Sequence, residues 1–445
     1  MSKASQISWW PLWHIGGAGL VGLLLLGLAT SNAAQPDSKP AAETPPPVLT
    51  LDEAVRWTLE HNPDLVALRQ QHGIAEAGVI IARAKPFNPT LEARVQGAEG
   101  PRSAAITNRV PNEHLLLFTV ETRGQAEHRL RGASATLSRT DWEIAFQEQT
   151  AAVRVVRAFH AVLYQQEKVK LVEEAVRLNE LGARQVRQLA DQGKLRGADL
   201  LVAVSEVDNV RRALGPGRAM LTTARTELFR ALGAEAGTFE LRGPKDYAPL
   251  HLDTEQLQQV ALEGRADLRA RQAAVSEAEA RLRLEVANRF GNPVVGPIWV
   301  YDPTGVHTFG AQMNVPIPLY NVHRGEILQR QAERDRAVLD VRRNEVLIRQ
   351  DVQAAVARLR DARAWVNIYK KEILPNLQKS LEGIEKLFAE GDPGVDVVKV
   401  LDLRRKLLSA RDGYLDAVWE VTQARADLAA ALGQPLLDVT PVPPP

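Results

Sequence analysis

The second half of this 445-residue sequence repeats the first, and this duplication limits the folds open to the chain. The repeat is clearest in two helical segments that restart after a glycine-containing break, at Asp199 and at Asp396. Both segments carry a large side chain at every seventh position: Leu200, Val207, Leu214, Leu221 and Leu228 in the first, and Val400, Leu407, Tyr414, Val421 and Leu428 in the second. A row of mostly small residues follows three positions later, which is the spacing of a coiled-coil seam. Two long copies predict a duplicated helical hairpin and not a solenoid, which needs several short repeats.

The duplication also predicts the fold class, which is mainly α-helical with a small β part and an internal two-fold repeat. We expect the first repeat to span residues 49–240 and the second to span residues 241–433. Each repeat begins with a helix, continues into a pair of strands and closes with a helical hairpin. The expected segments are strands 90–97 and 113–121 with hairpin 124–233, then strands 294–301 and 307–316 with hairpin 321–433.

Each expected hairpin contains a very long helix. No proline occurs between Gly124 and Asp191, and Val155, Val162, Val169 and Val176 recur there every seven residues. At ~1.5 Å per residue, a helix of this length is a rod of roughly 100 Å. A soluble enzyme core has little use for such a rod.

The expected strands alternate in polarity. Leu91, Ala93 and Val95 alternate with charged or amide side chains, and Phe309, Ala311 and Met313 alternate with glycine or amides. The runs are near the ~9 to 11 residues that a tilted strand needs to cross an outer membrane, where such alternation is required. A pair of soluble hairpins is the alternative. If the strands enter lipid, four of them cannot close a barrel and an open edge is not tolerated, so other copies of the chain must complete the sheet.

The two ends of the chain differ from the repeats in composition. Residues 1–34 combine Lys3, an apolar run and small residues, and are expected to be a cleaved secretory signal peptide; a permanent single-span anchor is the alternative. Residues 35–48 predict a flexible Pro- and Ala-rich leader, and residues 434–445 a disordered Pro-rich tail. The chain has no cysteine, so it can form neither a disulfide nor a lipid-modified cysteine anchor.

Composition and motif content argue against catalysis and nucleic-acid binding. The formal net charge is +1, which gives no overall attraction to nucleic acid. The histidines are scattered, and none shares an i, i+4 pair with another ligand of the metalloprotease kind. We therefore expect no enzyme activity, no cofactor and no metal site, and a partner must be inferred from shape.

Three motifs give the sequence a family resemblance. They are Leu-Thr-Leu-Asp-Glu-Ala-Val at 49–55, Val-Pro-Ile-Pro-Leu-Tyr-Asn at 315–321, and the Ile-Leu-Pro…Leu-Phe…Glu-Gly…Asp-Val-Val block at 373–398. With them the chain resembles the TolC-like outer membrane efflux proteins from Leu51 to Gly433, and most of all the channels of cobalt-zinc-cadmium (CzcC-type) resistance pumps. The resemblance implies a homotrimer with a 12-stranded β-barrel in the outer membrane and an α-barrel tunnel across the periplasm. It also implies docking onto a periplasmic adaptor and an inner-membrane RND-type pump.

In this family the tips of the helical hairpins form the gate and the adaptor contact. The matching positions are Gly193, Lys194, Arg196, Asp199, Gly391, Asp392, Gly394 and Asp396. Glycines allow the sharp turn, and aspartates from three chains could ring a constriction with negative charge. The alternative is that Asp199 and Asp396 are only N-caps of the returning helices.

Two functions remain open from the sequence. The first is a passive outer membrane channel for substrates delivered by the pump, with heavy-metal cations as a candidate substrate. The second is a periplasmic adaptor or structural coiled-coil protein that never enters a membrane. An adaptor normally has one hairpin, whereas this chain has two hairpins in phase, each preceded by a strand pair, and this duplication favours the channel.

Overall fold

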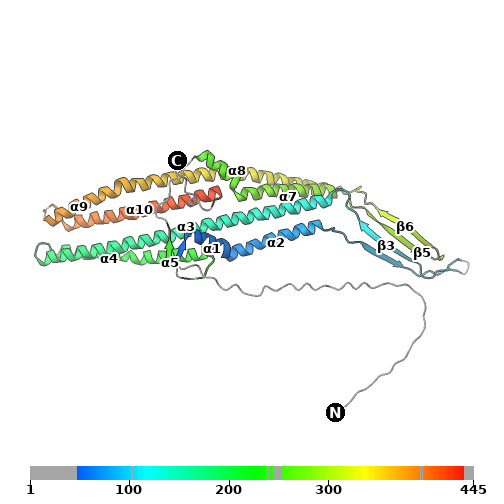
Figure 1. Cartoon of the computed structure of the whole chain (residues 1–445), viewed down its shortest axis with the longest axis horizontal. Coiled ribbons are helices and arrows are strands. Elements are labelled where there is room, and N and C mark those ends of the chain that lie inside the picture. Colours follow the sequence, from blue (N-terminus) through cyan, green and yellow to red (C-terminus); the bar gives the residue numbers. More distant parts are fainter. Residues whose placement is uncertain are drawn as a thin grey trace, which may run out of the picture. The chain divides into compact units, whose positions relative to one another are not determined.

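The computed structural model describes residues 48–101, 104–235, 237, 240–243, 253–390, 392 and 394–434. The expected signal peptide, most of the leader and nearly all of the tail lie outside these residues. Within the unit Thr44–Pro445, the helices run lengthwise beside one another and four strands lie together at one end (Figure 1). The predicted fold class, mainly α-helical with a small β part, is confirmed.

The helices of the first half are arranged along one long rod. They are α1 (Leu51–His61), α2 (Pro63–Arg83), α3 (Gln125–Asp191), α4 (Gly197–Arg212) and α5 (Leu214–Leu232). Helix α3 is continuous over 67 residues, and Val155, Val162, Val169 and Val176 are all buried along it. The return path breaks at Ala213, so that Pro216 falls in the first turn of α5, where its missing N–H leaves no intrahelical bond unmade.

The helices of the second half follow a similar course. They are α6 (Thr254–Gly264), α7 (Ala266–Asn288), α8 (Arg324–Ile368), a π-helical turn (Tyr369–Ile373), α9 (Leu374–Glu390) and α10 (Val397–Leu432). The π turn lies directly before Pro375, which cannot donate a backbone hydrogen bond and whose ring crowds the preceding turn. A π-helical turn is wider than an α-helical one and marks a local irregularity in the helix. Heptad periodicity alone does not predict it.

Two apolar cores hold the helices together at corresponding places. Leu228 and Leu232 of α5 pack with α1 and α3, while Leu428 and Leu432 of α10 pack with α6 and α8. Both returning helices end in a glycine with a left-handed backbone, Gly233 and Gly433, each at φ +70°. Each glycine also lies close to the backbone of a preceding helix junction, Asn62 in the first half and Gly264 with Arg265 in the second.

The strands form two sheets. They are β1 (Val48–Thr50), β2 (Thr90–Val95), β3 (Asn112–Thr119), β4 (Glu240–Arg242), β5 (Val294–Tyr301) and β6 (His307–Asn314). Strands β1 and β4 form a short parallel pair that the sequence did not predict, and Val48, expected in the flexible leader, belongs to it. The other strands form an antiparallel sheet in the order β2-β3-β5-β6, in which β3 and β5 join the two halves.

The register of the larger sheet aligns the apolar rows. Ala93, His114, Trp299 and Phe309 are successive partners across the four strands. Because side chains alternate along a strand, Leu91 and Val95 therefore share one face with Phe309 and Met313. These four side chains are 64–78% exposed. The opposite face carries the Arg94–Glu113 ion pair at 2.9 Å. Among the described helices, none is both long and apolar enough to cross a membrane.

Candidate functional site

The predicted site lies at the tips of the two helical hairpins, at the end of the helices remote from the strands (Figure 1). In the first tip, α3 ends at Asp191 and the chain reverses through Gly193, whose backbone is left-handed at φ +71°. The N–H groups of Gly193 and Lys194 donate to the carbonyls of Ala190 and Leu189, both at 2.9 Å. This closure satisfies carbonyls that a helix end leaves without partners, and it favours glycine at position 193.

Asp199 is not the N-cap of the returning helix, although the sequence predicted that position for it. Helix α4 begins at Gly197, so the N-cap is Arg196 and Asp199 is the third residue of the helix. Its Oδ2 accepts a hydrogen bond from the backbone N–H of Arg196 at 3.1 Å. The N-cap assignment is therefore wrong, because Gly197 and Ala198 already adopt helical conformations. A carboxylate at the third position can still fold back and satisfy the N–H of the cap residue.

In the second tip, Asp396 is the N-cap of α10, as predicted. Its Oδ1 accepts from the backbone N–H of Lys399 at 2.8 Å. Before it, Asp392 forms a turn in which its Oδ1 accepts from the N–H of Gly394 at 2.7 Å. The ammonium of Lys399 donates to the carbonyl of Gly394 at 2.6 Å. Gly391, the remaining predicted residue, lies outside the described residues.

The two tips pack against each other. Val186 and Ala203 of the first hairpin form a small buried cluster with Val397 and Leu401 of the second. A groove of about 970 Å³ runs between the tips. Its charged lining includes Lys194, Glu385, Glu390, Asp392 and Arg404. The structure thus brings Lys194 of the first tip and Asp392 of the second to one groove, while Arg196, Asp392, Gly394 and Asp396 are exposed.

Two ion pairs lie next to the tips, and sequence patterns do not predict them. Arg405 of α10 binds Glu206 of α4 at 2.6 Å, and Glu206 is only 6% exposed. Arg404 binds Glu385 of the neighbouring α9 at 2.5 Å. Glu206 and Arg405 are 199 positions apart, so helical periodicity cannot pair them. The first pair links the two hairpins and the second links α9 to α10.

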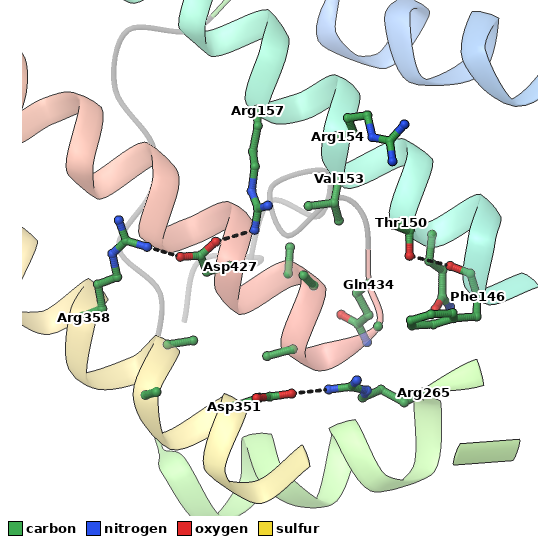
Figure 2. Close-up of a pocket in the computed structure, with 17 residues that line it drawn as sticks. Phe146, Thr150, Val153, Arg154, Arg157, Arg265, Asp351, Arg358, Asp427 and Gln434 are labelled. Atoms are coloured by element: carbon green, nitrogen blue, oxygen red, sulfur yellow. Dashed lines mark hydrogen bonds and ion pairs between the residues drawn. The ribbon is translucent and has the colours of Figure 1, made fainter. Parts of the chain in front are cut away.

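A second cleft, of about 640 Å³, is lined by residues of α3, α8 and α10 (Figure 2). The carboxylate of Asp427 in α10 forms ion pairs with Arg157 of α3 and Arg358 of α8. Asp351 forms an ion pair with Arg265 at 3.1 Å. A hydrogen bond to Glu420 at 2.6 Å contributes most to raising the pKa of Arg358. Both carboxylates in the cleft are held by arginines, so neither is poised as an acid or base. The cluster ties the two halves of the chain together.

A third polar cluster joins α3 to α10. Lys168 contacts Asp412 at 2.9 Å and Asp416 at 2.7 Å, and Tyr164 donates to Asp416. Burial alone would lower the pKa of Lys168, but hydrogen bonds to Asp416 and Asp412 raise it. Burial likewise opposes ionisation of Asp416, yet Lys168 and Tyr164 hold its pKa below the ordinary value. These shifts keep Lys168 and Asp416 charged at neutral pH, as in a structural contact.

Among the described residues, no group of three or more histidine and carboxylate side chains is placed to hold a metal ion. The three clusters above consist of paired charges, with no nucleophile beside a base. The remaining candidates for a functional surface are the hairpin tips, the groove between them and the exposed edges of the four-stranded sheet.

Comparison with known proteins gives consistent results. The family model described as outer membrane efflux protein matches residues 55–234 and 301–434. The cobalt-zinc-cadmium resistance protein CzcC of Cupriavidus metallidurans is 24% identical over 389 residues, which cover 87% of this chain and 90% of that protein. The solved outer-membrane channel OprN superposes with a TM-score of 0.71 at 16% identity, covering 86% of this chain and 89% of that one. The solved structure of CusC superposes with a TM-score of 0.65 at 18% identity, covering 86% of this chain and 92% of that one.

Proposed function

The chain belongs to the outer membrane efflux protein family, and from this premise we propose that it is the outer membrane channel of a tripartite efflux system. In this proposal its strands lie in the outer membrane of a Gram-negative type envelope and its helices extend into the periplasm. Substrates pass through it passively, because an inner-membrane RND-type pump supplies the driving force and a periplasmic adaptor joins the two.

The observation that carries the proposal is the open four-stranded sheet. Within the described part of the chain, strands β2 and β6 each have one neighbour, so each leaves a row of backbone N–H and C=O groups without strand partners. The apolar side chains of Leu91 and Phe309 are exposed on these same two strands. In lipid such an edge costs several kcal/mol for each unsatisfied group, so β2 of one copy must pair with β6 of the next. Three copies would close a barrel of 12 strands, the homotrimer that the resemblance implies.

The hairpin tips would form the periplasmic mouth of this trimer. Their exposed charges, which include Lys194, Arg196, Asp392 and Asp396, are available to an adaptor or to a passing ion. Three copies of each aspartate around one axis would favour cations at the mouth. The Glu206–Arg405 pair would hold the two hairpins together behind the groove, and its breakage would let the tips move apart as a gate.

Heavy-metal cations are the substrate class that we propose. The support is the relative CzcC, whose name refers to cobalt, zinc and cadmium resistance. A channel that only conducts needs no metal site of its own, because selection can occur in the pump.

Replacing the gene for CzcC in Cupriavidus metallidurans with the gene for this chain tests the proposal. We expect growth on zinc, cobalt and cadmium to be restored relative to an empty-vector control, with the native gene as the positive control. The purified protein should also give stepwise currents in planar bilayers. Absence of currents would contradict the channel, whereas currents without restored growth would contradict only the metal substrate or the match to that pump.

A further inference from the structure

Among the described residues, the chain passes between the helices and the four-stranded sheet four times, and all four crossings lie at one end of the helices (Figure 1). They are residues 84–89, 120–124, 289–293 and 315–323. The crossings also contact one another: the side chain of Gln125 donates to that of Asn292 at 2.7 Å, and the N–H of Val120 donates to the carbonyl of Pro293 at 2.9 Å. They therefore form one level in the protein, at the base of the strands.

Three crossings contain a cation and the fourth is followed directly by Arg324, the first residue of α8, and the cations repeat between the two halves. Lys85 and Arg289 both stand four residues before the proline that opens a strand pair. Arg123 and Arg324 both stand directly before a glycine at the start of a long helix. We call these four residues the basic collar. All four side chains belong to exposed residues.

Among the residues that the structure describes, no carboxylate neutralises the charge of the collar. None of its four residues forms an ion pair among the described residues, and nearby carboxylates are occupied elsewhere: Glu121 binds Arg129 at 2.6 Å and Glu285 binds His323 at 3.0 Å. Within three residues of the crossings, Arg83 adds a fifth cation without an ion pair, and Glu92 and Glu326 are the described carboxylates without one. Near the crossings, each chain therefore has five positive and two negative side chains that form no ion pair among the described residues.

Large apolar side chains surround these cations. The guanidinium of Arg123 lies 3.8 Å from the ring centre of Phe290, and that of Arg289 lies 5.6 Å from it. In the last crossing, Ile317, Leu319 and Tyr320 are 73%, 74% and 100% exposed. Aromatic side chains and cations with exposed apolar neighbours are enriched where a protein passes from lipid into water, because the rings bury their apolar body while the charge stays at the headgroups.

We propose that the basic collar binds the anionic phosphate headgroups of the membrane leaflet that faces the helices, and so fixes the depth of the strands in the bilayer. The inference rests on the proposed function, since it requires the strands to enter lipid. Guanidinium groups pair with phosphate oxygens in a two-pronged geometry, and each Lys or Arg near an anionic surface adds attraction. In a homotrimer the four positions supply twelve cations at a single level.

The test uses the full-length protein in neutral detergent. Its thermal midpoint is followed while phosphatidylglycerol, phosphatidylcholine or inorganic phosphate is added. We expect phosphatidylglycerol to raise the midpoint at concentrations about tenfold below those of phosphatidylcholine, and salt to weaken this preference. The variant K85Q/R123Q/R289Q/R324Q should lose the preference, whereas K85R/R123K/R289K/R324K, which keeps the charges, should retain it.

A matched control removes the same number of exposed positive charges from the helices, as R225Q/R271Q/R343Q/R360Q, and should behave like the native protein. Equal effects of the two lipids on the native protein, or a preference that survives in the glutamine variant of the collar, would overturn the proposal. So would an equal effect of inorganic phosphate, which would make the collar a site for a soluble anion. Failure of the proposed function is distinguishable, because the native protein would then not float with phosphatidylcholine vesicles at all.

Discussion

At the scale of single residues, His160 stands out among the buried polar groups. It lies on α3, is 7% exposed and packs against Phe159 with ring centres 5.7 Å apart. Burial, reinforced by the positive charge of Arg425, lowers the pKa of His160 to about 4. The histidine is therefore neutral in the folded protein at neutral pH.

This shift predicts a pH dependence with a definite sign. The pKa of His160 is 6.5 in the unfolded chain and about 4 in the folded chain. At pH values between these two, the unfolded chain therefore binds a proton at His160 that the folded chain does not. Stability is therefore complete above pH 6.5 and is lost as the pH falls through that range, by about 2 kcal/mol per chain between pH 7 and pH 5. The variant His160→Gln should lose less stability over this interval than the native protein, as measured by unfolding in detergent at both pH values.

His72 provides the control for this measurement. A hydrogen bond to Asp141 raises the pKa of His72, so its protonated form stabilises the folded chain below pH 6.5. His72→Gln should not reduce the loss of stability on acidification. If His160→Gln and the native protein lost the same stability between pH 7 and pH 5, the buried neutral histidine would be excluded as a cause.

The tip aspartates give a second prediction at this scale. Asp396→Ala removes the N-cap of α10 and should lower stability by about 1 kcal/mol. If the aspartates also line the mouth of a trimeric channel, the variants Asp199→Ala and Asp396→Ala should lower the cation preference in planar bilayers, measured by the reversal potential in a salt gradient. Asp208→Ala, at an exposed position on α4 away from the turn, is the control. Unchanged reversal potentials would leave both tip aspartates with capping roles only.

At the scale of elements, close packing of α10 against the π turn sets a steric limit. A Cβ atom at Gly413 would meet the hydroxyl of Tyr369 at 2.6 Å and its ring carbon Cζ at 3.1 Å. At Gly182 of α3, a Cβ atom would meet only the end of the flexible Arg404 side chain, at 2.5 Å. Both glycines lie within helices, yet only the first faces a rigid neighbour.

Gly413→Ala should therefore lower stability by about 1–3 kcal/mol, because the ring of Tyr369 must move in a packed interface. Gly182→Ala should be neutral or slightly stabilising, since alanine favours a helix more than glycine does. Thermal unfolding of the two variants checks this difference. The double variant Gly413→Ala with Tyr369→Phe removes the nearest clashing atom and should recover part of the loss; equal midpoints for Gly413→Ala and Gly182→Ala would contradict the steric account.

The helices also show which structural features the sequence pattern predicts and which it does not. Heptad rows identify which side of a helix is buried, and Val155 and Val352, both fully buried, follow that rule. The rows do not say which helices meet, so the long-range pairs of Asp427 with Arg157 and of Glu206 with Arg405 could not be anticipated. Nor does periodicity place a helix start to the residue, and this is why Asp199 was assigned to the N-cap instead of the third helical position. The π turn before Pro375 depends on how the chain relieves a steric conflict, which the sequence pattern does not encode.

At the scale of the whole molecule, the sheet is the part that one chain leaves incomplete. The fold class and the family were predictable, because the duplication extends over both halves and three motifs carry the family resemblance; the family model matches residues 55–234 and 301–434. The assembly cannot be read from one chain. It follows from the proposal that β2 and β6 find their missing partners in other copies, and that the hairpin tips of those copies form one mouth.

The proposed channel is best tested by the mass of the protein extracted from purified outer membranes in mild detergent, measured by light scattering with the detergent contribution subtracted. We expect a species of three chains, which resists dissociation on dilution because its strand edges are paired. A monomer recovered from the soluble periplasmic fraction would contradict the channel and favour a periplasmic adaptor.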